Sequence, residues 1–576
     1  MLKEPNELEG LDSVDWRGLE PELPELSELS ELSATDVPKV LRRIARADGR
    51  TRPEVLDRAF GDLQDLLLAP GRVSDLGTAA LPFLVDLALD PETAARPDVI
   101  DVIAGLAAND AAAGPAAPCP AWSRAWRRHW PRLSMVLADA DQLVRRSALR
   151  LISDRPGSLL ERWHEETDLS VRVTLLLALG DAAAARESAS DDSASDDSAG
   201  ATIADVRAVL DGALHGEDRV LRVAAVIAMA RLDPQAPLRA RPMVLELLTD
   251  PALAPEFEKV WYTLNCEYPY DRNDVAGWVV HLLADDVPAA TSFVAGLAEA
   301  GSRTGDVELH RCALDEAWRL LVTRPSAATA LLPLAAGLLA APDDDVRYKA
   351  THLLAVLGPL AAPYADRLAA LLDDPGESRL FDGCVGDHAR WALTRLGDPR
   401  ALPDLVERLV APYRDLQGWG YCIGDPRRPD VADVLRPLRA HAGELLPAVR
   451  EALRDEVARK GWLIGDLREV IQAWGEDPTL PGETEPYPPL WEPPLMEAAQ
   501  AEATVLAFVA DEEEQHWTFI TALTSLIHHG HASPPVREAL ATLRMADRRL
   551  SRYGDYRAFQ EDKEIRERID AVLALP

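Results

Sequence analysis

Apolar residues recur every three to four positions over most of the chain, which is the spacing of one face of an α-helix. The first such segment follows Asp36, and its apolar face comprises Val37, Val40, Leu41 and Ile44. Further amphipathic segments begin near Pro53, Asp75 and Pro97. The alternating pattern of β-branched residues that is typical of strands is nearly absent. The pattern therefore predicts an all-α protein from residue 36 onward.

Several stretches of biased composition interrupt this helical pattern. Residues 1–35 contain the acidic phrase LPELSELSELS and are predicted to be a disordered arm. The tract SASDDSASDDSAG predicts a disordered loop over 186–200, aromatic and glycine residues predict an inserted loop over 411–430, and prolines predict a linker over 476–495. The helical parts are then an N-terminal unit over 36–110, a repeat region over 121–475 and a C-terminal module over 496–576.

A recurring motif is the strongest signal in the chain. Four segments carry the pattern Asp-x-x-[Val/Leu]-Arg, and they begin at Asp141, Asp168, Asp218 and Asp343. A fifth segment, which begins at Asp382, has Gly386 where the others have arginine. The last two segments match over the longest stretch, with Ala350 and Ala389 in register. The motif predicts stacked copies of one helical unit.

This repeat resembles the HEAT repeat, a helix–turn–helix unit of about 40 residues, in its bacterial lyase-like (PBS-lyase HEAT-like) variety. The phrase LGDPRALPDLVERL is similar to the start of that family's second helix, and the opening helical unit is similar to HEAT-repeat proteins of actinobacteria. The resemblance implies an α-solenoid of the ARM/HEAT superhelix type, whose helix pairs bury their apolar stripes against one another. It also implies a structural role, bridging neighbouring units, for the motif arginines Arg145, Arg172, Arg222 and Arg347.

Composition narrows the classes of partner. The chain has 576 residues and a formal net charge of −35, which repels the phosphate backbone and argues against nucleic-acid binding. The same charge favours a protein partner with a basic segment, because opposite charges speed association. The cysteines form no C-x-x-C pair. With no apolar leader or membrane-length apolar run, we expect a cytoplasmic protein that does not bind membranes.

No residue pattern indicates catalysis, a cofactor or a metal. HEAT-like deoxyhypusine hydroxylases hold a di-iron centre with His-Glu pairs, but here His388 is followed by Ala389. The resemblance therefore implies no di-iron centre, and we predict neither a metal nor a cofactor.

Three groups of aromatic and arginine residues are candidates for partner contact, with local packing as the open alternative. The first group lies on one helical face at Trp122, Trp126 and Trp130. The other two interrupt the helical pattern at Trp261, Tyr262, Tyr268, Tyr270 and Arg272, and at Tyr413, Arg414, Trp419 and Tyr421. Loops between scaffold helices often carry function, which favours the latter two groups.

The sequence thus favours a non-enzymatic scaffold that presents a concave, acidic solenoid surface to another protein. Two alternatives remain open. One is a HEAT-like enzyme of the lyase type, and the other is a small-molecule binder that uses the tryptophan- and arginine-rich elements.

Overall fold

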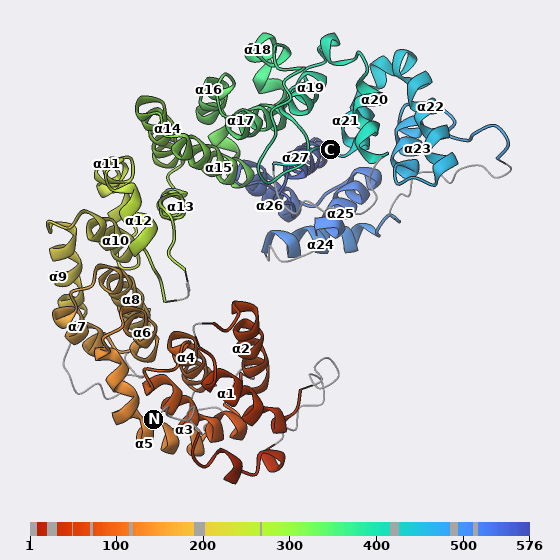
Figure 1. Cartoon of the computed structure of the whole chain (residues 1–576). Helices are drawn as coiled ribbons and strands as arrows, with labels where there is room; N and C mark the ends of the chain where they lie inside the picture. The colour runs from red at the N-terminus through yellow and green to blue at the C-terminus, as the bar shows by residue number, and fades with distance from the viewer. Residues whose placement is uncertain are drawn as a thin grey trace. The chain divides into compact units, whose positions relative to one another are not determined.

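The computed structural model describes residues 8–19, 32–48, 50–68, 73–113, 119–188, 202–264, 268–414, 426–483, 494–510 and 516–576. In these residues the chain forms successive helix pairs, and the one extended pairing is an isolated antiparallel bridge between Glu377 and Cys384. This confirms the predicted fold class, an all-α solenoid of HEAT-like helix pairs with a C-terminal helical module (Figure 1). No helix in the described part of the chain is both long enough and apolar enough to cross a membrane.

The chain divides into two compact units, residues 1–282 and 283–576, each described here by itself. The helices of unit 1 are α1 (Val37–Ala45), α2 (Pro53–Leu67), α3 (Asp75–Leu89), α4 (Arg96–Ala113), α5 (Pro120–Leu133), α6 (Gln142–Ala148), α7 (Pro156–Glu165), α8 (Leu169–Ser188), α9 (Ile203–Leu214), α10 (Arg219–Ala230), α11 (Ala236–Leu248), α12 (Ala254–Val260) and α13 (Arg272–Leu283), which ends at the boundary. Short 3-10 helices are η1 (Leu11–Ser13), η2 (Trp16–Leu19), η3 (Ala34–Asp36), η5 (Ser134–Ala138) and η6 (Leu149–Ile152).

The helices of unit 2 are α14 (Val287–Thr304), α15 (Val307–Thr323), α16 (Ala328–Leu338), α17 (Asp344–Leu357), α18 (Ala365–Ala369), α19 (Val385–Arg395), α20 (Leu405–Val410), α21 (Val431–Leu435), α22 (Ala442–Arg459), α23 (Ile464–Ala473), α24 (Ala498–Ala510), α25 (His516–His529), α26 (Pro534–Met545) and α27 (Arg557–Leu573). The 3-10 helices are η8 (Pro325–Ala327), η9 (Gly358–Tyr364), η10 (Pro399–Ala401), η11 (Ala411–Tyr413) and η12 (Arg436–His441). In unit 2 the helices α15, α17, α19 and α21 follow one another as neighbours in a row. These helices are the second members of their helix pairs, and the row is called the second row of unit 2 below.

The recurring motif has a direct structural explanation at the helix starts. Its aspartate caps the first turn of α6, α8, α10 and α17 by accepting backbone N–H groups, for example Leu143 N to Asp141 Oδ1 at 2.8 Å and Val346 N to Asp343 Oδ1 at 3.0 Å. The apolar residue three positions later is buried in each case, at Val144, Val171, Leu221 and Val346. The motif therefore fixes where each helix begins and which face it buries.

The deviation at Gly386 follows from a close backbone approach. A Cβ atom at this position would lie 2.7 Å from the carbonyl oxygen of Leu372, and the Gly386 N–H donates to Asp374 O at 3.0 Å. The start of α19 thus rests on the preceding turn, and no larger side chain fits there. In place of the motif aspartate, Cys384 is the N-cap residue of α19.

Two of the motif arginines make the same set of contacts. Arg347 donates from Nε and Nη2 to both carboxylate oxygens of Asp374, at 2.8 and 3.1 Å, and from Nη1 to the carbonyls that precede its own helix. Arg145 does the same with Glu166, at 2.9 and 3.1 Å, and Arg162 approaches that carboxylate to 3.5 Å. Each bidentate pair ties the start of one helix to a turn that follows it.

The other two motif arginines differ. Arg222 donates to the carbonyl of Leu214, at the end of α9, at 3.2 Å. Arg172 places its guanidinium 4.2 Å from the ring centre of Trp163, and no hydrogen-bond partner of its buried Nε is found among the described residues. The same sequence motif therefore supports both ion pairs and cation–π contacts.

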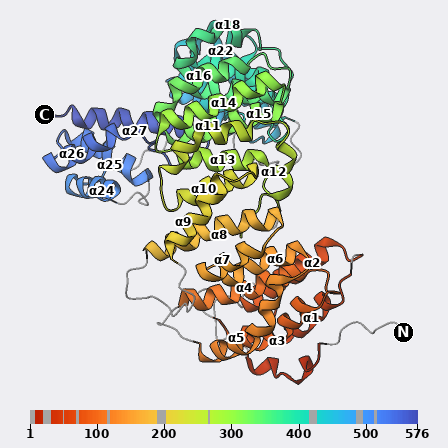
Figure 2. The ribbon, with the colours of Figure 1, turned by 90° about the vertical axis from the view of Figure 1, so that its left-hand side faces the viewer.

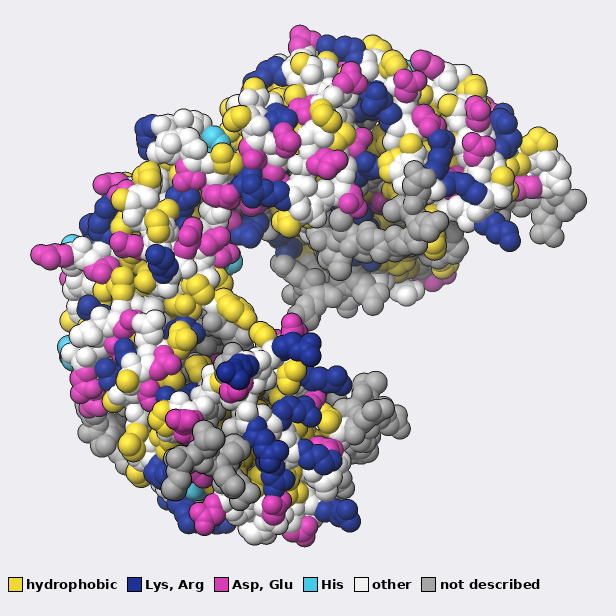
Figure 3. Space-filling model, in the orientation of Figure 1, with side chains coloured by type: hydrophobic (Ala, Val, Ile, Leu, Met, Phe, Trp, Pro, Cys, Tyr) yellow, Lys and Arg dark blue, Asp and Glu magenta, His cyan; other side chains and the backbone are white. Residues whose placement is uncertain are grey.

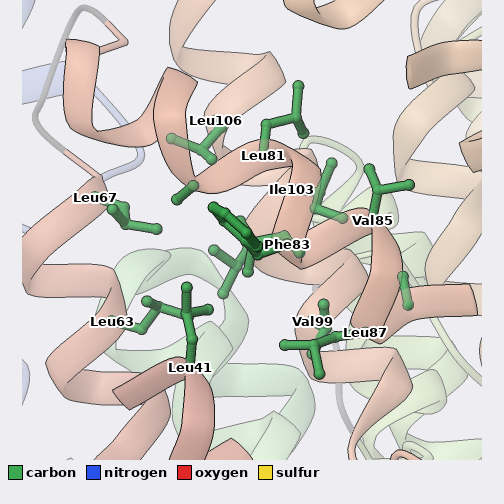
Figure 4. Close-up of a cluster of buried hydrophobic side chains, with 14 of the residues drawn as sticks. Leu41, Leu63, Leu67, Leu81, Phe83, Val85, Leu87, Val99, Ile103 and Leu106 are labelled. Carbon is green, nitrogen blue, oxygen red and sulfur yellow. The ribbon is translucent and has the colours of Figure 1, made fainter. Parts of the chain in front are cut away.

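The core of unit 1 extends into the segment predicted to be a disordered arm. Aliphatic side chains of α1–α4 with Phe83 form a continuous buried cluster (Figure 4). Leu11 and Trp16, from η1 and η2, are 1% and 5% exposed and belong to this cluster. The Trp16 Nε1–H donates to Leu11 O at 2.9 Å, so the indole is buried with its polar atom satisfied. Residues 8–19 are therefore folded, contrary to the prediction for 1–35.

Three other predicted segments contain undescribed residues. Helix α8 continues to Ser188 and so includes the first three residues of the loop predicted over 186–200, while 189–201 lie outside the described residues. Residues 415–425 of the predicted inserted loop and 484–493 of the predicted linker also lie outside them.

The C-terminal module has its own core. Apolar side chains of α24–α27, among them Phe508, Phe519 and Ile565, form a buried cluster of their own. The module packs against the second row of unit 2, where Tyr556 and Phe559 meet Trp391 and Trp318.

Helices α8 and α10 touch backbone to backbone at Gly180. A Cβ atom there would lie 2.6 Å from Ala228 O and 2.9 Å from Ala228 Cα. We expect Gly180→Ala to lower the free energy of unfolding by about 1–3 kcal/mol, because α10 must move away. As a control, Gly212→Ala in α9 meets nothing within 4 Å and should raise it by about 0.5–1 kcal/mol. Urea denaturation measures both, and equal effects would contradict the close approach.

Arg347 gives a second test of the stacking contacts. Its guanidinium lowers the pKa of the Asp374 carboxyl, whose side chain is 14% exposed. Arg347→Met removes this cation, and we expect a loss of about 2–3 kcal/mol at pH 7 in urea denaturation. Because the folded-state pKa of Asp374 is lowered, this loss should shrink as the pH falls below its ordinary value of 3.8. The matched variant Arg172→Met, which removes a cation–π contact, should cost about 1 kcal/mol with no such pH dependence.

Candidate binding groove

A groove of about 630 Å³ lies on unit 1 and draws its walls from several successive repeats. Its floor consists of short or buried apolar residues of α4, α8 and α10, namely Ala104, Ala108, Leu177, Ala178, Ile227 and Ala228. Polar and charged side chains on its rim are Arg150, Ser153, Asp181, Arg231, Thr263 and His281. An apolar floor with a few polar groups is the usual composition of a binding pocket, and the volume lies in the usual range.

The aromatic wall comes from the segment between α12 and α13. Its two ends are joined by the Tyr270 N–H, which donates to Trp261 O at 2.8 Å. This closure places the Tyr270 ring against Trp278 of α13, with ring centres 4.6 Å apart in an edge-to-face arrangement. Trp278 packs in turn on the buried Trp261, at 6.4 Å. These contacts place the half-buried rings of Tyr270 and Trp278 at the groove.

Two ion pairs lie along the groove. Arg231 Nε is 2.9 Å from Asp181 Oδ1, and Arg150 Nη1 is 3.2 Å from Asp101 Oδ1. Burial by the groove walls raises the pKa of Asp181, against the lowering effect of Arg231. The Asp181 side chain nevertheless keeps 59% of its exposure, so it is open to a ligand from the solvent side. The groove therefore offers apolar contact and charges of both signs.

The predicted residues of this segment occupy four different settings. Tyr270 lines the groove, whereas Trp261 is fully buried behind it and Arg272 is 6% exposed. The Tyr262 ring lies under the guanidinium of Arg146, 3.7 Å from ring centre to carbon. Tyr268 is not among the residues that line the groove and is 75% exposed. Of the five side chains predicted in this segment, only that of Tyr270 lines the groove, and their role in partner contact stays a prediction.

The other two predicted groups lie elsewhere. Trp122, Trp126 and Trp130 stack along α5 with ring centres 5.5 and 5.6 Å apart, and they pack on the core of unit 1. In unit 2, Arg414 forms a bidentate pair with Glu407, and burial raises the pKa of Tyr413. Trp419 and Tyr421 lie outside the described residues.

Several groove residues were not predicted. Trp278 and His281 belong to a helix whose apolar pattern resembles ordinary core. Asp181 lies within α8 and Arg231 follows the last residue of α10, so the two residues come from different repeats. The available signal was Trp278 itself, a large aromatic beside a segment already singled out for its aromatics. Contacts between residues of different repeats depend on how the helices stack, and no local sequence pattern indicates them.

Sequence analysis also missed a buried histidine pair in unit 2. His352 of α17 and His388 of α19 are 1% and 0% exposed, and their Nδ1 atoms are 3.4 Å apart. Aromatic rings surround them, contributed by Trp318, Tyr348 and Trp391. Such a setting excludes water from both rings.

The surroundings of the pair disfavour its charged form. Burial lowers the pKa of His388 to about 3; Asp387 opposes this effect and Arg428 adds to it. Burial also lowers the pKa of His352 well below its ordinary value, and His388, Arg395 and Arg427 lower it further. Both rings are therefore neutral at pH 7. Among the described residues, no group of three or more His, Cys, Asp or Glu side chains is arranged to hold a metal ion.

No protein-family model and no curated protein sequence matches this chain. Among solved structures, it is similar to a chain in a homology model of the full-length AP-3 complex in an intermediate open conformation, at 11% identity and a TM-score of 0.34, with 93% of this chain and 90% of that chain covered. It is also similar to the UNC-45 chaperone in a study of its binding and folding of muscle myosin, at 11% identity and a TM-score of 0.25, with 95% and 79% covered. At these TM-scores neither similarity bears on function.

The histidine pair predicts a specific acid sensitivity. Because the folded-state pKa of His388 is lowered from 6.5 to about 3, its contribution to stability is complete above pH 6.5 and is lost as the pH falls toward 3. Between pH 6.5 and 4.5 we expect it to account for a loss of about 2–3 kcal/mol in the free energy of unfolding. His388→Gln should flatten this part of the pH profile in urea denaturation. His215→Gln, at a histidine whose side chain is 72% exposed, should leave it unchanged.

Proposed function

We propose that this helical-repeat protein is a non-enzymatic scaffold that binds an extended segment of another protein in the groove of unit 1. The observation that supports this most directly is the pairing of Tyr270 and Trp278 over an apolar floor that several repeats build together. A site of this kind holds an apolar anchor residue of the partner against the two rings. The neighbouring ion pairs supply hydrogen-bonding groups for the flanking residues.

Charge supports a basic partner segment. The chain carries a net charge of −35, so a segment rich in Lys or Arg is attracted before contact is made. Carboxylates and basic side chains alternate over both units in the view of Figure 3, so the attraction is general and does not come from one uniformly acidic face in that view. Local recognition then depends on the groove, where Asp181 remains open to solvent beside Arg231. In this proposal the net charge increases the rate of association, and the groove determines which segment binds.

Small-molecule binding is the second candidate. It is favoured by the groove volume of about 630 Å³, which suits an organic ligand as well as a peptide anchor. The two functions share one site and differ in the length of the ligand.

A set of designed peptides tests the proposal on the full chain. Each peptide has a central Leu or Phe anchor flanked by Lys and Arg, and a matched series carries Asp and Glu flanks. We expect the basic series to bind at least about tenfold more tightly at low salt, and this advantage to shrink as salt is added. Fluorescence anisotropy measures the affinities. Preference for the acidic series, or no binding by either series, would overturn the proposed partner chemistry.

A matched pair of tyrosine variants tests the location. Tyr270→Ser removes a groove wall and should weaken basic-peptide binding about tenfold or more. Tyr268→Ser, two positions earlier in the same segment but outside the groove lining, should leave binding within about twofold. If the two variants have equal effects, the contact lies on the exposed segment and not in the groove.

A further inference from the structure

Within unit 2, the C-terminal module contacts the second row through the segment Ala546–Phe559, called the docking segment below (ADRRLSRYGDYRAF). This segment connects α26 with the first turn of α27. It lies against the second row of unit 2, along the side on which Figures 1 and 2 show α24–α27. Its contacts are local, specific and mostly polar, which sets them apart from the apolar packing between repeats.

The first anchor is at the end of α15. The Arg549 backbone N–H donates to Thr323 O at 3.1 Å, and its Nε donates to Leu321 O at 2.6 Å. The last carbonyls of a helix have no intrahelical partner and form its negative end, so a cation is favoured there. Asp547 completes the anchor by accepting the Ser326 N–H at 3.0 Å, with its other oxygen 2.5 Å from Ser326 Oγ. The motif Asp-x-Arg thus recognises one turn of the array by its backbone groups.

The second anchor is an aromatic residue with a polar tip. Tyr556 is fully buried, with its ring edge-on to Trp391 at 5.3 Å. Its hydroxyl donates to Asp433 Oδ2 at 2.8 Å and accepts the Asp430 N–H at 3.0 Å. Three residues further on, Phe559 packs on Trp318 at 5.7 Å. This slot accepts a Tyr-x-x-Phe sequence seven residues after the arginine.

The module does not depend on this contact for its own core. Its buried cluster is formed by residues from Ala501 to Val572, and no residue of the second row belongs to that cluster. The docking contacts consist of hydrogen bonds, ion pairs and a few rings, a composition typical of interfaces that open and close. The docking segment contributes Leu550 to this core, and undocking separates the second row from the module without taking any residue of the second row out of the core.

We propose that the second row of unit 2 is a binding surface for an Asp-x-Arg segment followed by Tyr-x-x-Phe, and that the C-terminal module occupies it as an intramolecular ligand. A partner protein with an arginine- and tyrosine-bearing segment of this kind binds when the module undocks. The module thereby controls the access of such a partner to the second row. This proposal does not rest on the groove of unit 1, which involves none of these residues.

The test uses the full chain and a labelled peptide with the sequence of residues 545–562. In the unaltered chain the docking segment competes at high effective concentration, so the peptide should bind weakly. Arg549→Ala removes the helix-end contact in cis, together with the contact of Arg549 Nη1 with Asp562 Oδ2 at 3.3 Å inside the module. We expect peptide affinity to rise at least about tenfold. A peptide that lacks the arginine should bind Arg549→Ala no more tightly than it binds the unaltered chain. Arg552→Ala is the matched control, because the contacts that Arg552 makes in the described part of the chain, with Glu561 and Tyr553, lie within the module.

Hydrogen exchange on the same variants separates undocking from unfolding. We expect Arg549→Ala to speed exchange at residues 321–326 while α24–α26 stay protected. Tyr556→Phe, which keeps the ring and loses the hydroxyl, should have the same effect to a smaller degree. Faster exchange throughout the module together with α15 would show one cooperative unit and overturn the proposal. The absence of peptide binding to every variant would also overturn the proposal. Self-association of Arg549→Ala without peptide binding would overturn it as well, because the surface would then bind a second copy of the chain.

Discussion

Each helix pair of this protein has an apolar stripe that only the next pair can cover. Because this constraint recurs at every step, the chain needs helices that begin at fixed points and approach one another closely. The capping aspartates, such as Asp141 and Asp343, fix the starting points. Small residues allow the approach, most closely where Gly180 meets the backbone of Ala228. The arginine–carboxylate pairs then join successive turns, as Arg347 does with Asp374.

The same stacking that builds the core also builds the groove. Short alanine side chains at 104, 178 and 228 line its floor, and the segment between α12 and α13 adds an aromatic wall. A solenoid with uniform repeats would have no such wall. The groove therefore arises where the repeat is interrupted, while the regular repeats on either side hold it in shape.

Sequence analysis predicts the fold well because its determinants are local. Helical periodicity, capping aspartates and buried apolar positions are all visible within one turn or two, and the starts of α1–α3 agree with the predicted ones. The candidate site is less predictable, since Asp181, Arg231 and Trp278 meet only through the stacking of distant repeats. The buried histidines illustrate the same limit: His352 and His388 occupy non-equivalent repeat positions and meet because α17 and α19 are neighbours. The folded segment 8–19 was missed for a related reason, as one tryptophan in an acidic stretch carries no periodic signal.

The two proposed binding surfaces use different physical means. In unit 1 the aromatic rings belong to the array, and a ligand supplies the apolar anchor. In unit 2 the array supplies helix-end carbonyls and carboxylates together with Trp318 and Trp391, and the ligand supplies the arginine and the tyrosine. Helix ends are repeated at every turn of a solenoid, so each turn is a place where an arginine can be held. What makes the turn after α15 selective is its neighbour, the slot for Tyr556, because two anchors at a fixed spacing reject segments that carry only one of them.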